Sequence, residues 1–387
     1  MYRYGFAVFD STDRMRLSNA DEIFAECIGC NLCQKDCAFL AKYGNPLEIL
    51  QKFPADDPRR YEIAFECSLC GLCGSVCPKN LDISGFFLDL RRNAVQMEMI
   101  GLNTYKRILN FEKKGNSDRY GFHYVPPACD TVFFPGCNLP GSRPGKTLKC
   151  YGYIREVIPD AGIVLGCCAK PSHDLGRKKH FESVFSTLVE LFAQNGIKRV
   201  VVACPNCHKV FRTYAGHLDV RTIYELMAEN GISSHHGPGT GIPVNIHDPC
   251  SVRFERDIHE SVRYIAGRKG LEIRETAFSR EKTFCCGEGG AVGCVAPELS
   301  QTWASMRIND SETGRILTYC AGCVDFLGRK SGAFHLLDLL FEPEKVANGN
   351  WRISRPPFTY LNRIKLKRRL KRNSSVPVPP RDLQALF

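Results

Sequence analysis

The sequence predicts a mixed fold: a mostly helical N-terminal domain of the α+β type, followed by two duplicated α/β domains with parallel sheets. Three observations lead to this prediction. Two tight cysteine runs lie in the first 111 residues, within helical-looking sequence. The same order of five cysteines then occurs twice, in residues 130–235 and 244–342. In both copies short apolar runs alternate with amphipathic stretches, which is typical of parallel α/β sheets.

The N-terminal region, residues 1–111, contains two runs with the spacing CxxCxxCxxxC. The second is followed by Pro78 and matches the run of bacterial two-cluster ferredoxins, whereas the first is followed by Ala38. In that arrangement three cysteines hold one [4Fe–4S] cluster and the fourth reaches the other cluster. The spacing therefore predicts two cubane [4Fe–4S] clusters. Cluster one would be bound by Cys27, Cys30, Cys33 and Cys77, and cluster two by Cys67, Cys70, Cys73 and Cys37.

Disulfides and zinc are the alternative explanations for the 21 cysteines. Disulfide scaffolds are usually short secreted chains, but this chain has 387 residues, an odd number of cysteines and no secretory signal between Met1 and Arg16. Zinc usually takes four thiolates from two CxxC pairs, so a triple CxxCxxC run suits one tetrahedral zinc poorly. Iron–sulfur clusters in a reducing compartment are the favoured interpretation.

Residues 130–235 and 244–342 are internal repeats, and the Gly- and Pro-containing segments 112–129 and 236–243 before them are predicted linkers. In the first copy, 29 residues separate the lone cysteine from the cysteine pair, and 35 separate the pair from the CxxC motif. In the second copy these two gaps are 34 and 33 residues. Amphipathic stretches at 181–194 and 257–266 are predicted helices. Short β-branched runs are predicted buried strands: Thr131–Phe134, Ile163–Leu165, Val200–Val202, Val244–Ile246 and Ile316–Thr318.

Each copy offers five thiols, more than the four that a mononuclear zinc site needs. Open α/β sheets place their ligands at the carboxyl ends of the strands, so the thiols of one copy are expected to meet there. Adjacent cysteines need a bend to face one site, which Gly166 and Gly287 would supply. The glycines of 287–293 lack the GxGxxG spacing, so backbone approach to a cluster is preferred over nucleotide binding.

The order Cys–CC–CxxC, twice, behind a ferredoxin-type pair resembles the catalytic subunit of heterodisulfide reductase and its relatives. Those relatives include the iron–sulfur subunits of glycolate, lactate and anaerobic glycerol-3-phosphate oxidoreductases. The resemblance runs from about Ala25 to Glu342. It implies one non-cubane [4Fe–4S] cluster in each copy. The implied ligands, which are also the implied catalytic residues, are Cys137, Cys167, Cys168, Cys204 and Cys207 in the first copy and Cys250, Cys285, Cys286, Cys320 and Cys323 in the second.

The first copy departs from the family pattern at one position. The usual CCG is intact at Gly287 in the second copy, but Ala169 follows the cysteine pair in the first. The extra methyl group puts a full cluster in the first copy in question.

The function that the resemblance implies is that of a heterodisulfide reductase-like oxidoreductase. Electrons would pass from the two cubane clusters to the paired cysteine-rich domains, where a disulfide is split between the two non-cubane clusters. The alternative is a non-catalytic relay between a flavin dehydrogenase and a quinone or membrane partner. No flavin or nucleotide motif is evident in the sequence, so another protein subunit is expected to supply the electrons.

The predicted C-terminal tail, residues 343–387, concentrates positive charge. Seven of its residues between 361 and 373 are basic and none is acidic, in a chain of net charge +11. A solvated helix end or disordered tail and a contact with anionic lipid or an acidic subunit both fit this pattern. No reading motif or stacking aromatics accompany the charge, so nucleic acid is not an expected partner. The expected location is the cytoplasm, with the inner face of the membrane as a peripheral site.

Three cysteines fall outside both patterns: Cys129, Cys150 and Cys294. They are predicted small buried hydrophobes, with a spare ligand or a redox thiol as the alternative. Three histidines lie beside expected ligands: His173, His208 and His247. These are predicted to hold loops rather than to transfer protons. Asp174 and Asp248 are expected to brace turns.

Overall fold

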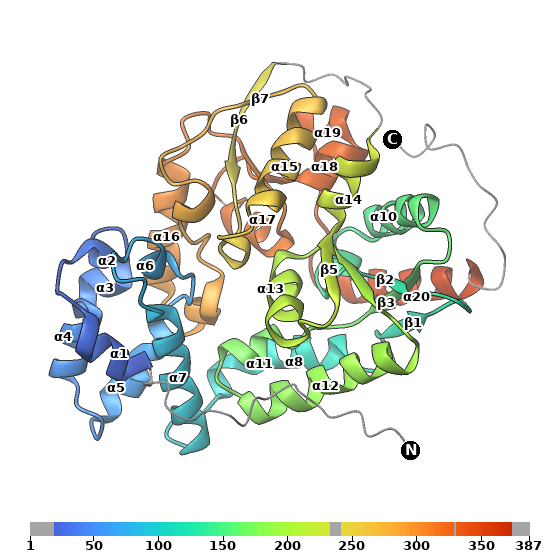
Figure 1. Cartoon of the computed structure of the whole chain (residues 1–387). Coiled ribbons are helices and arrows are strands. Elements are labelled where there is room, and N and C mark those ends of the chain that lie inside the picture. The colour runs from blue at the N-terminus through green and yellow to red at the C-terminus, as the bar shows by residue number, and fades with distance from the viewer. Residues whose placement is uncertain (1–18, 233–240, 329, 374–387) are drawn as a thin grey trace.

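The computed structural model describes residues 19–232, 241–328 and 330–373 (Figure 1). A helical N-terminal part, drawn in blue, lies beside two parts that each contain a sheet. The predicted fold class is confirmed. Among the described residues, no helix is both long and apolar enough to cross a membrane.

The N-terminal part consists of short helices whose ends follow from local sequence. Helix α4 begins at Pro46, because Asn45 and Glu48 cap it reciprocally. Helix α7 begins after Asp82, whose carboxylate accepts the Gly85 N–H. The elements are α1 (Asn19–Glu26), α2 (Leu32–Lys35), α3 (Ala38–Tyr43), α4 (Pro46–Lys52), α5 (Pro58–Ile63), η1 (Ala64–Glu66), α6 (Leu72–Ser75), α7 (Ile83–Gln96), η2 (Asn103–Tyr105) and α8 (Lys106–Gly115).

The first repeat contains a five-stranded sheet of order β1-β3-β2-β4-β5, parallel except for the edge strand β1. Strand β1 lies inside the segment 112–129 that the sequence predicts to be a linker, so this linker also completes the sheet. The strands are β1 (Phe122–Tyr124), β2 (Thr131–Phe134), β3 (Gly162–Leu165), β4 (Arg199–Val202) and β5 (Asp219–Thr222). The helices are α9 (Leu139–Ser142), α10 (Pro144–Val157), α11 (Lys170–Asp174), α12 (Lys178–Gln194), α13 (Pro205–Tyr214) and α14 (Ile223–Asn230).

The second repeat has a four-stranded parallel sheet of order β7-β6-β8-β9, which reproduces the order of β3, β2, β4 and β5. Of the predicted linker 236–243, residues 236–240 lie outside the described residues and 242–243 open β6. The strands are β6 (Ile242–His247), β7 (Leu271–Ile273), β8 (Ile316–Thr318) and β9 (Phe334–His335). The helices are η3 (Cys250–Val252), α15 (Arg256–Arg268), η4 (Arg280–Lys282), η5 (Gly289–Cys294), α16 (Pro297–Asn309), α17 (Ala321–Leu327) and α18 (Leu336–Phe341).

The two repeats share one hydrophobic core. Met227 of α14 and Ile258 of α15 belong to the same buried cluster, and these two helices pack against each other. A second cluster joins the N-terminal part to the second repeat, because Leu299 and Trp303 of α16 are buried together with Phe39 of α3. In Figure 1, α16 (orange) accordingly lies against the blue helices.

The basic C-terminal segment forms a helix. After α19 (Pro343–Ala347), helix α20 (Phe358–Asn373) packs on α9 and α10. Leu366 and Leu370 enter the shared core, and Arg363 is buried as well. Of the alternatives for the basic segment, a solvated surface describes only one face of this helix, where Lys365 and Arg368 are exposed, and residues 374–387 lie outside the described residues.

Candidate iron–sulfur sites

The two ferredoxin-type runs exchange their fourth cysteines in space. One small cavity is lined by Cys27, Cys30, Cys33 and Cys77. A second cavity is lined by Cys37, Cys67, Cys70 and Cys73. The structure thus brings together the two sets of four that the spacing predicts.

The loops around these cavities are shaped by left-handed residues at equivalent positions. Gly29 and Asn31 have φ of 64° and 61°, and Leu69 and Gly71 have φ of 54° and 73°. Successive residues of alternating hand turn backbone N–H groups inward, which favours an anionic guest. The Leu69 N–H already donates to the Cys67 sulfur at 3.4 Å.

The chemistry of these thiols fits a metal cluster. Burial raises the pKa of Cys33 to about 12, and burial likewise raises the pKa of Cys67 to about 12. Thiols so desolvated stay neutral without a cation, whereas a bound metal deprotonates a coordinating thiol outright. Four convergent sulfurs around an apolar cavity are therefore suited to an iron–sulfur cluster.

The cysteines of the first repeat converge at the carboxyl ends of β2, β3 and β4. The Cys207 thiol donates to the Cys168 sulfur at 3.5 Å. Cys204 forms a hydrogen-bonded pair with Cys207, and Cys137 forms one with Cys167. A Cβ at Gly136 would lie 3.2 Å from the Cys207 sulfur, so the glycine before Cys137 leaves room for this set.

The cysteines of the second repeat converge in the same way. Cys250 pairs with Cys285, Cys286 with Cys323, and Cys323 with Cys320. Both CxxC motifs sit at a helix start, because Cys204 and Cys320 are the residues that precede α13 and α17. The structure therefore unites five thiols in each repeat, as the sequence predicts.

The residue after each cysteine pair takes the same left-handed conformation. Gly287 has φ of +97°, and Ala169 has φ of +57°. Glycine adopts this region without strain, whereas alanine does so at a cost. The bend expected from Gly166 lies instead at Ala169, three residues later.

One tyrosine links the backbone segments that carry the two cysteine sets. The Tyr224 hydroxyl contacts the carbonyl oxygens of Ala203 at 3.1 Å and Tyr319 at 3.2 Å. These two residues immediately precede Cys204 and Cys320. A single phenol thus bridges the strand ends that carry the two CxxC motifs.

Two ionisable side chains that sequence reasoning missed, Lys170 and Glu288, lie between the sets. Lys170, in an ion pair with Asp174, is close to both Cys168 and Cys250. Burial lowers the pKa of Lys170, but Asp174 and the two thiols outweigh this effect and raise it, so the ammonium stays charged. The ligand atoms of Glu288, Cys320 and Cys323 lie within 4.8 Å of one another.

Glycine at position 322 makes room for the Glu288 carboxylate. A Cβ at Gly322 would lie 1.9 Å from Glu288 Oε2, so a side chain at this position would displace the carboxylate from its place beside the thiols. Burial and then Asp325 raise the pKa of Glu288 to about 8. The only sequence signal for this residue is its place in the 287–293 loop, where glycines form the more conspicuous pattern.

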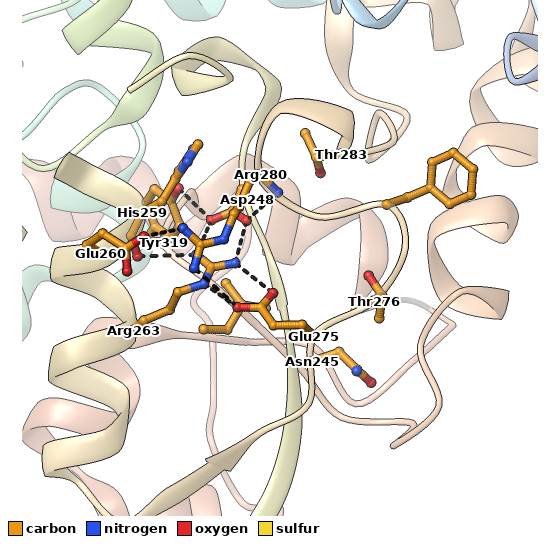
Figure 2. Close-up of polar contacts among 12 residues, drawn as sticks. Asn245, Asp248, His259, Glu260, Arg263, Glu275, Thr276, Arg280, Thr283 and Tyr319 are labelled. Atoms are coloured by element: carbon orange, nitrogen blue, oxygen red, sulfur yellow. Dashed lines mark hydrogen bonds and ion pairs between the residues drawn. The ribbon is translucent and has the colours of Figure 1, made fainter. Parts of the chain in front are cut away.

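Asp248 anchors the loop that carries Cys250, as the sequence predicts. Its carboxylate accepts two hydrogen bonds from Arg263, at 3.0 and 2.9 Å, and one from the Tyr319 hydroxyl at 3.0 Å. The Arg280 N–H adds a fourth at 2.8 Å. Figure 2 shows these contacts converging on Asp248 from separate segments. The network fixes the strand end from which Cys250 projects.

The three histidines differ in their surroundings. Both ring nitrogens of His173 are bonded, to Asp174 at 2.9 Å and to the Tyr214 hydroxyl at 2.7 Å, which agrees with a loop-holding role. His208 has a buried Nδ1 without a partner among the described residues. In His247 both buried nitrogens lack one, although Cys286 and Cys323 are adjacent. Loop holding therefore does not account for His247.

The unassigned cysteines fit the prediction of small hydrophobes in two of three cases. Cys150 is fully buried in α10, and Cys129 is buried with its thiol donating to the Thr131 carbonyl at 3.1 Å. Cys294 is only half-buried.

Two arginines join the ferredoxin-like part to the repeats. The buried Arg91 guanidinium donates to carbonyl oxygens in three parts of the chain: Ala64 and Cys67, Asp174, and Gly290. Arg253 donates to the Cys70 carbonyl at 3.1 Å and to that of Thr283 at 2.9 Å. The same junction places Cys285 in the lining of the cavity formed by Cys37, Cys67, Cys70 and Cys73.

Comparison with known proteins agrees with this division of the chain. Residues 26–82 match the 4Fe-4S dicluster domain, and residues 131–212 and 244–328 each match the cysteine-rich domain. One of the subunits of the fumarate reductase (CoM/CoB) of Methanothermobacter marburgensis is 25% identical, over 77% of this chain and 66% of its own length.

Two further relatives are similar over most of the chain. One of the subunits of the dihydromethanophenazine:CoB–CoM heterodisulfide reductase of Methanosarcina barkeri is 24% identical, over 63% of this chain and 66% of its own length. The EtfAB:quinone oxidoreductase of Syntrophomonas wolfei is 22% identical, over 66% of this chain and 40% of its own length. The chain thus spans just under two thirds of the length of the first two relatives and less of the third. It belongs to the iron–sulfur proteins that combine a 4Fe-4S dicluster domain with two cysteine-rich domains, and its relatives include this heterodisulfide reductase protein.

Proposed function

We propose that this chain carries electrons through two cubane clusters to two cysteine-rich clusters and reduces a disulfide between them. The observation that carries the proposal is the junction at Cys285, which lines the cavity of the second ferredoxin-type set and also belongs to the second cysteine-rich set. Cys285 would thus hold one cluster and form part of the wall around the other. The first cysteine-rich set then follows across the Tyr224 bridge.

Electrons would enter at the first ferredoxin-type set, because it lies nearest the surface. Cys30 is exposed, and Phe24 and Ile28 beside it are 67% and 63% exposed. Exposed Asp21 and Glu22 flank this apolar patch. An electron-donating protein with an apolar, basic contact surface would fit this edge.

The region between the cysteine-rich sets has the side chains that a disulfide substrate needs. When bound, the clusters would supply two electrons, which together with one proton convert a disulfide to one thiol and one thiolate. The Lys170 ammonium would attract an anionic substrate and stabilise a thiolate product. The Glu288 carboxyl group would deliver a proton at Oε2 to the departing sulfur.

The test is anaerobic purification followed by analysis for iron, sulfide and zinc. Four [4Fe–4S] clusters predict about 16 iron per chain. The purified protein should reduce anionic disulfides with dithionite-reduced viologen as donor. Cys320→Ala should abolish this activity, whereas Cys150→Ala, which removes a buried thiol outside the sets, should retain it. About eight iron with one or two zinc per chain would contradict the proposal.

A relay function is the second candidate, and the cavity beside α20 favours it. This cavity of about 1750 Å³ is lined by aromatic side chains, among them Tyr124, Tyr151 and Trp351, and by cations that include Arg352 and Arg369. A quinone head group or an apolar partner segment would fit such a lining. Reduction of a water-soluble quinone by a chain without disulfide reductase activity would favour the relay.

A further inference from the structure

Arg363 stands apart from the other basic residues of α20. Its side chain is 1% exposed, whereas Lys365 and Arg368 on the same helix are exposed. Its guanidinium group lies over the Tyr120 ring, 5.7 Å from the ring centre, and one nitrogen donates to the Gly115 carbonyl at 3.1 Å. The chain therefore buries one positive charge of a helix that otherwise displays its charges.

The buried guanidinium group has unused hydrogen-bond donors. Nε and Nη1 have no hydrogen-bond partner among the residues that the structure describes, and within the same residues no carboxylate pairs with Arg363. Buried arginines are normally paired and fully hydrogen-bonded, because an uncompensated charge in the protein interior is strongly unfavourable. An anion is therefore expected next to Arg363.

The open side of Arg363 faces the first cysteine-rich set. A Cβ at Gly115 would lie 3.0 Å from Cys167 Cβ and 3.6 Å from Arg363 Nη1, so only the missing side chain of a glycine separates the two residues. Burial lowers the pKa of Arg363, and the neighbouring Cys137 and Cys167 oppose this effect.

The second repeat offers a contrast. Arg253 lies near Cys250 at the corresponding pair of thiols, but its guanidinium group is engaged by the carbonyl oxygens of Cys70, Glu281 and Thr283. Its donors hold loops together and are not free for sulfur. Each site thus has an arginine nearby, but only the first has an arginine with unused N–H donors.

We propose that Arg363 is the counter-cation and N–H donor of a cluster bound by the first cysteine-rich set, so that α20 is part of that redox site. The inference rests on the proposed function, since it needs a cluster at Cys137 and Cys167. A positive charge beside a cluster favours its reduced form, because the added electron is stabilised. Arg363 would thus raise the potential of the first cysteine-rich cluster.

The experiment is an EPR-monitored redox titration of the whole protein, preceded by iron analysis. Arg363→Gln should leave the oxidised-to-reduced ratio unchanged for three clusters. For the cluster of the first cysteine-rich set, it should raise the oxidised-to-reduced ratio at least about tenfold at fixed potential. This corresponds to a shift of about 59 mV to lower potential for one electron. Arg363→Lys, which keeps the charge, should bring the oxidised-to-reduced ratio of this cluster close to the wild-type value. Arg368→Gln removes one positive charge from the exposed face of α20 and should leave the oxidised-to-reduced ratios of all four clusters unchanged.

Each outcome decides the matter. Wild-type protein without iron in the first cysteine-rich set would overturn both the proposed function and this inference. With about 16 iron present, equal titrations of wild type, Arg363→Gln and Arg368→Gln would overturn the inference alone. Loss of one cluster from Arg363→Gln in a folded chain, with recovery in Arg363→Lys, would support it. If circular dichroism shows that both Arg363 variants are unfolded, Arg363 is a packing residue only and the inference is wrong.

Discussion

Gly287→Ala adds a methyl group directly after the cysteine pair of the second repeat and should disrupt that cysteine-rich site. At φ of +97°, a new Cβ would lie 2.4 Å from the Ser300 carbonyl oxygen and 3.2 Å from its hydroxyl. That hydroxyl donates to the Gly287 carbonyl at 2.6 Å, so relief of the clash also breaks this bond. The backbone oxygen belongs to α16, which packs on the ferredoxin-like part and has little room to move.

The magnitude follows from three contributions. A left-handed conformation costs a residue with a side chain about 1–2 kcal/mol relative to glycine. Overpacking against a buried backbone atom adds about 1–3 kcal/mol. Loss of the Ser300 hydrogen bond adds about 1 kcal/mol. The free energy of unfolding should fall by about 4 kcal/mol.

The matched comparison is Ala169→Gly in the other repeat. There the natural alanine already occupies the left-handed region, at φ of +57°, so glycine should be neutral or stabilising by up to about 1 kcal/mol. The assay is the guanidinium midpoint for loss of cluster absorbance, with iron content measured before unfolding. If Gly287→Ala keeps full iron and a wild-type midpoint, the steric reasoning is refuted.

Three further predictions concern the junction, the response to pH and the substrate region. Arg91→Met leaves four buried carbonyl groups without their hydrogen bonds, so the free energy of unfolding should fall by at least about 3 kcal/mol. Amide hydrogen exchange should become faster at Gly290, and unchanged exchange there would contradict this prediction. Burial lowers the pKa of His335 to about 3, while the unfolded side chain titrates near 6.5, so below pH 6.5 the unfolded state binds the extra proton and stability is lost. His335→Asn, which keeps the helix cap, should therefore reduce the stability lost between pH 7 and 5 by about 2 kcal/mol in denaturant titrations, and an unchanged loss would exclude this role. Lys170→Gln should lower kcat/KM for an anionic disulfide at least about tenfold but leave that for a neutral disulfide nearly unchanged; equal losses would argue against charge recognition.

The local elements could largely be predicted from the sequence. Strand Thr131–Phe134 forms as predicted, because a run of four β-branched and aromatic residues has no polar face to expose. Helix α12 covers the predicted 181–194, since Phe181, Phe185 and Val189 recur at helical spacing. The grouping of the ferredoxin-type thiols followed from spacing alone.

Contacts between distant segments could not be predicted in this way. Strand β1 has too little hydrophobic pattern to be recognised, and it is a strand only because β3 offers an edge. Glu288 faces the cysteines because Gly322, more than thirty residues away, leaves space for it. Arg363 lies in a run of similar basic residues, and only packing on the first repeat selects it for burial.

The shared core of the two repeats has a consequence for the kinetics of the protein. Met227 and Ile258, one from each repeat, lie in a single apolar cluster, so the described residues of the two repeats are packed together. Some multidomain redox proteins shuttle a swinging domain between donor and acceptor, and their turnover slows in viscous solvent. In this chain shared cores join the parts that would hold the proposed clusters, so electron passage within it should be independent of solvent viscosity. Glycerol should slow only the encounter with the donor protein and with the substrate.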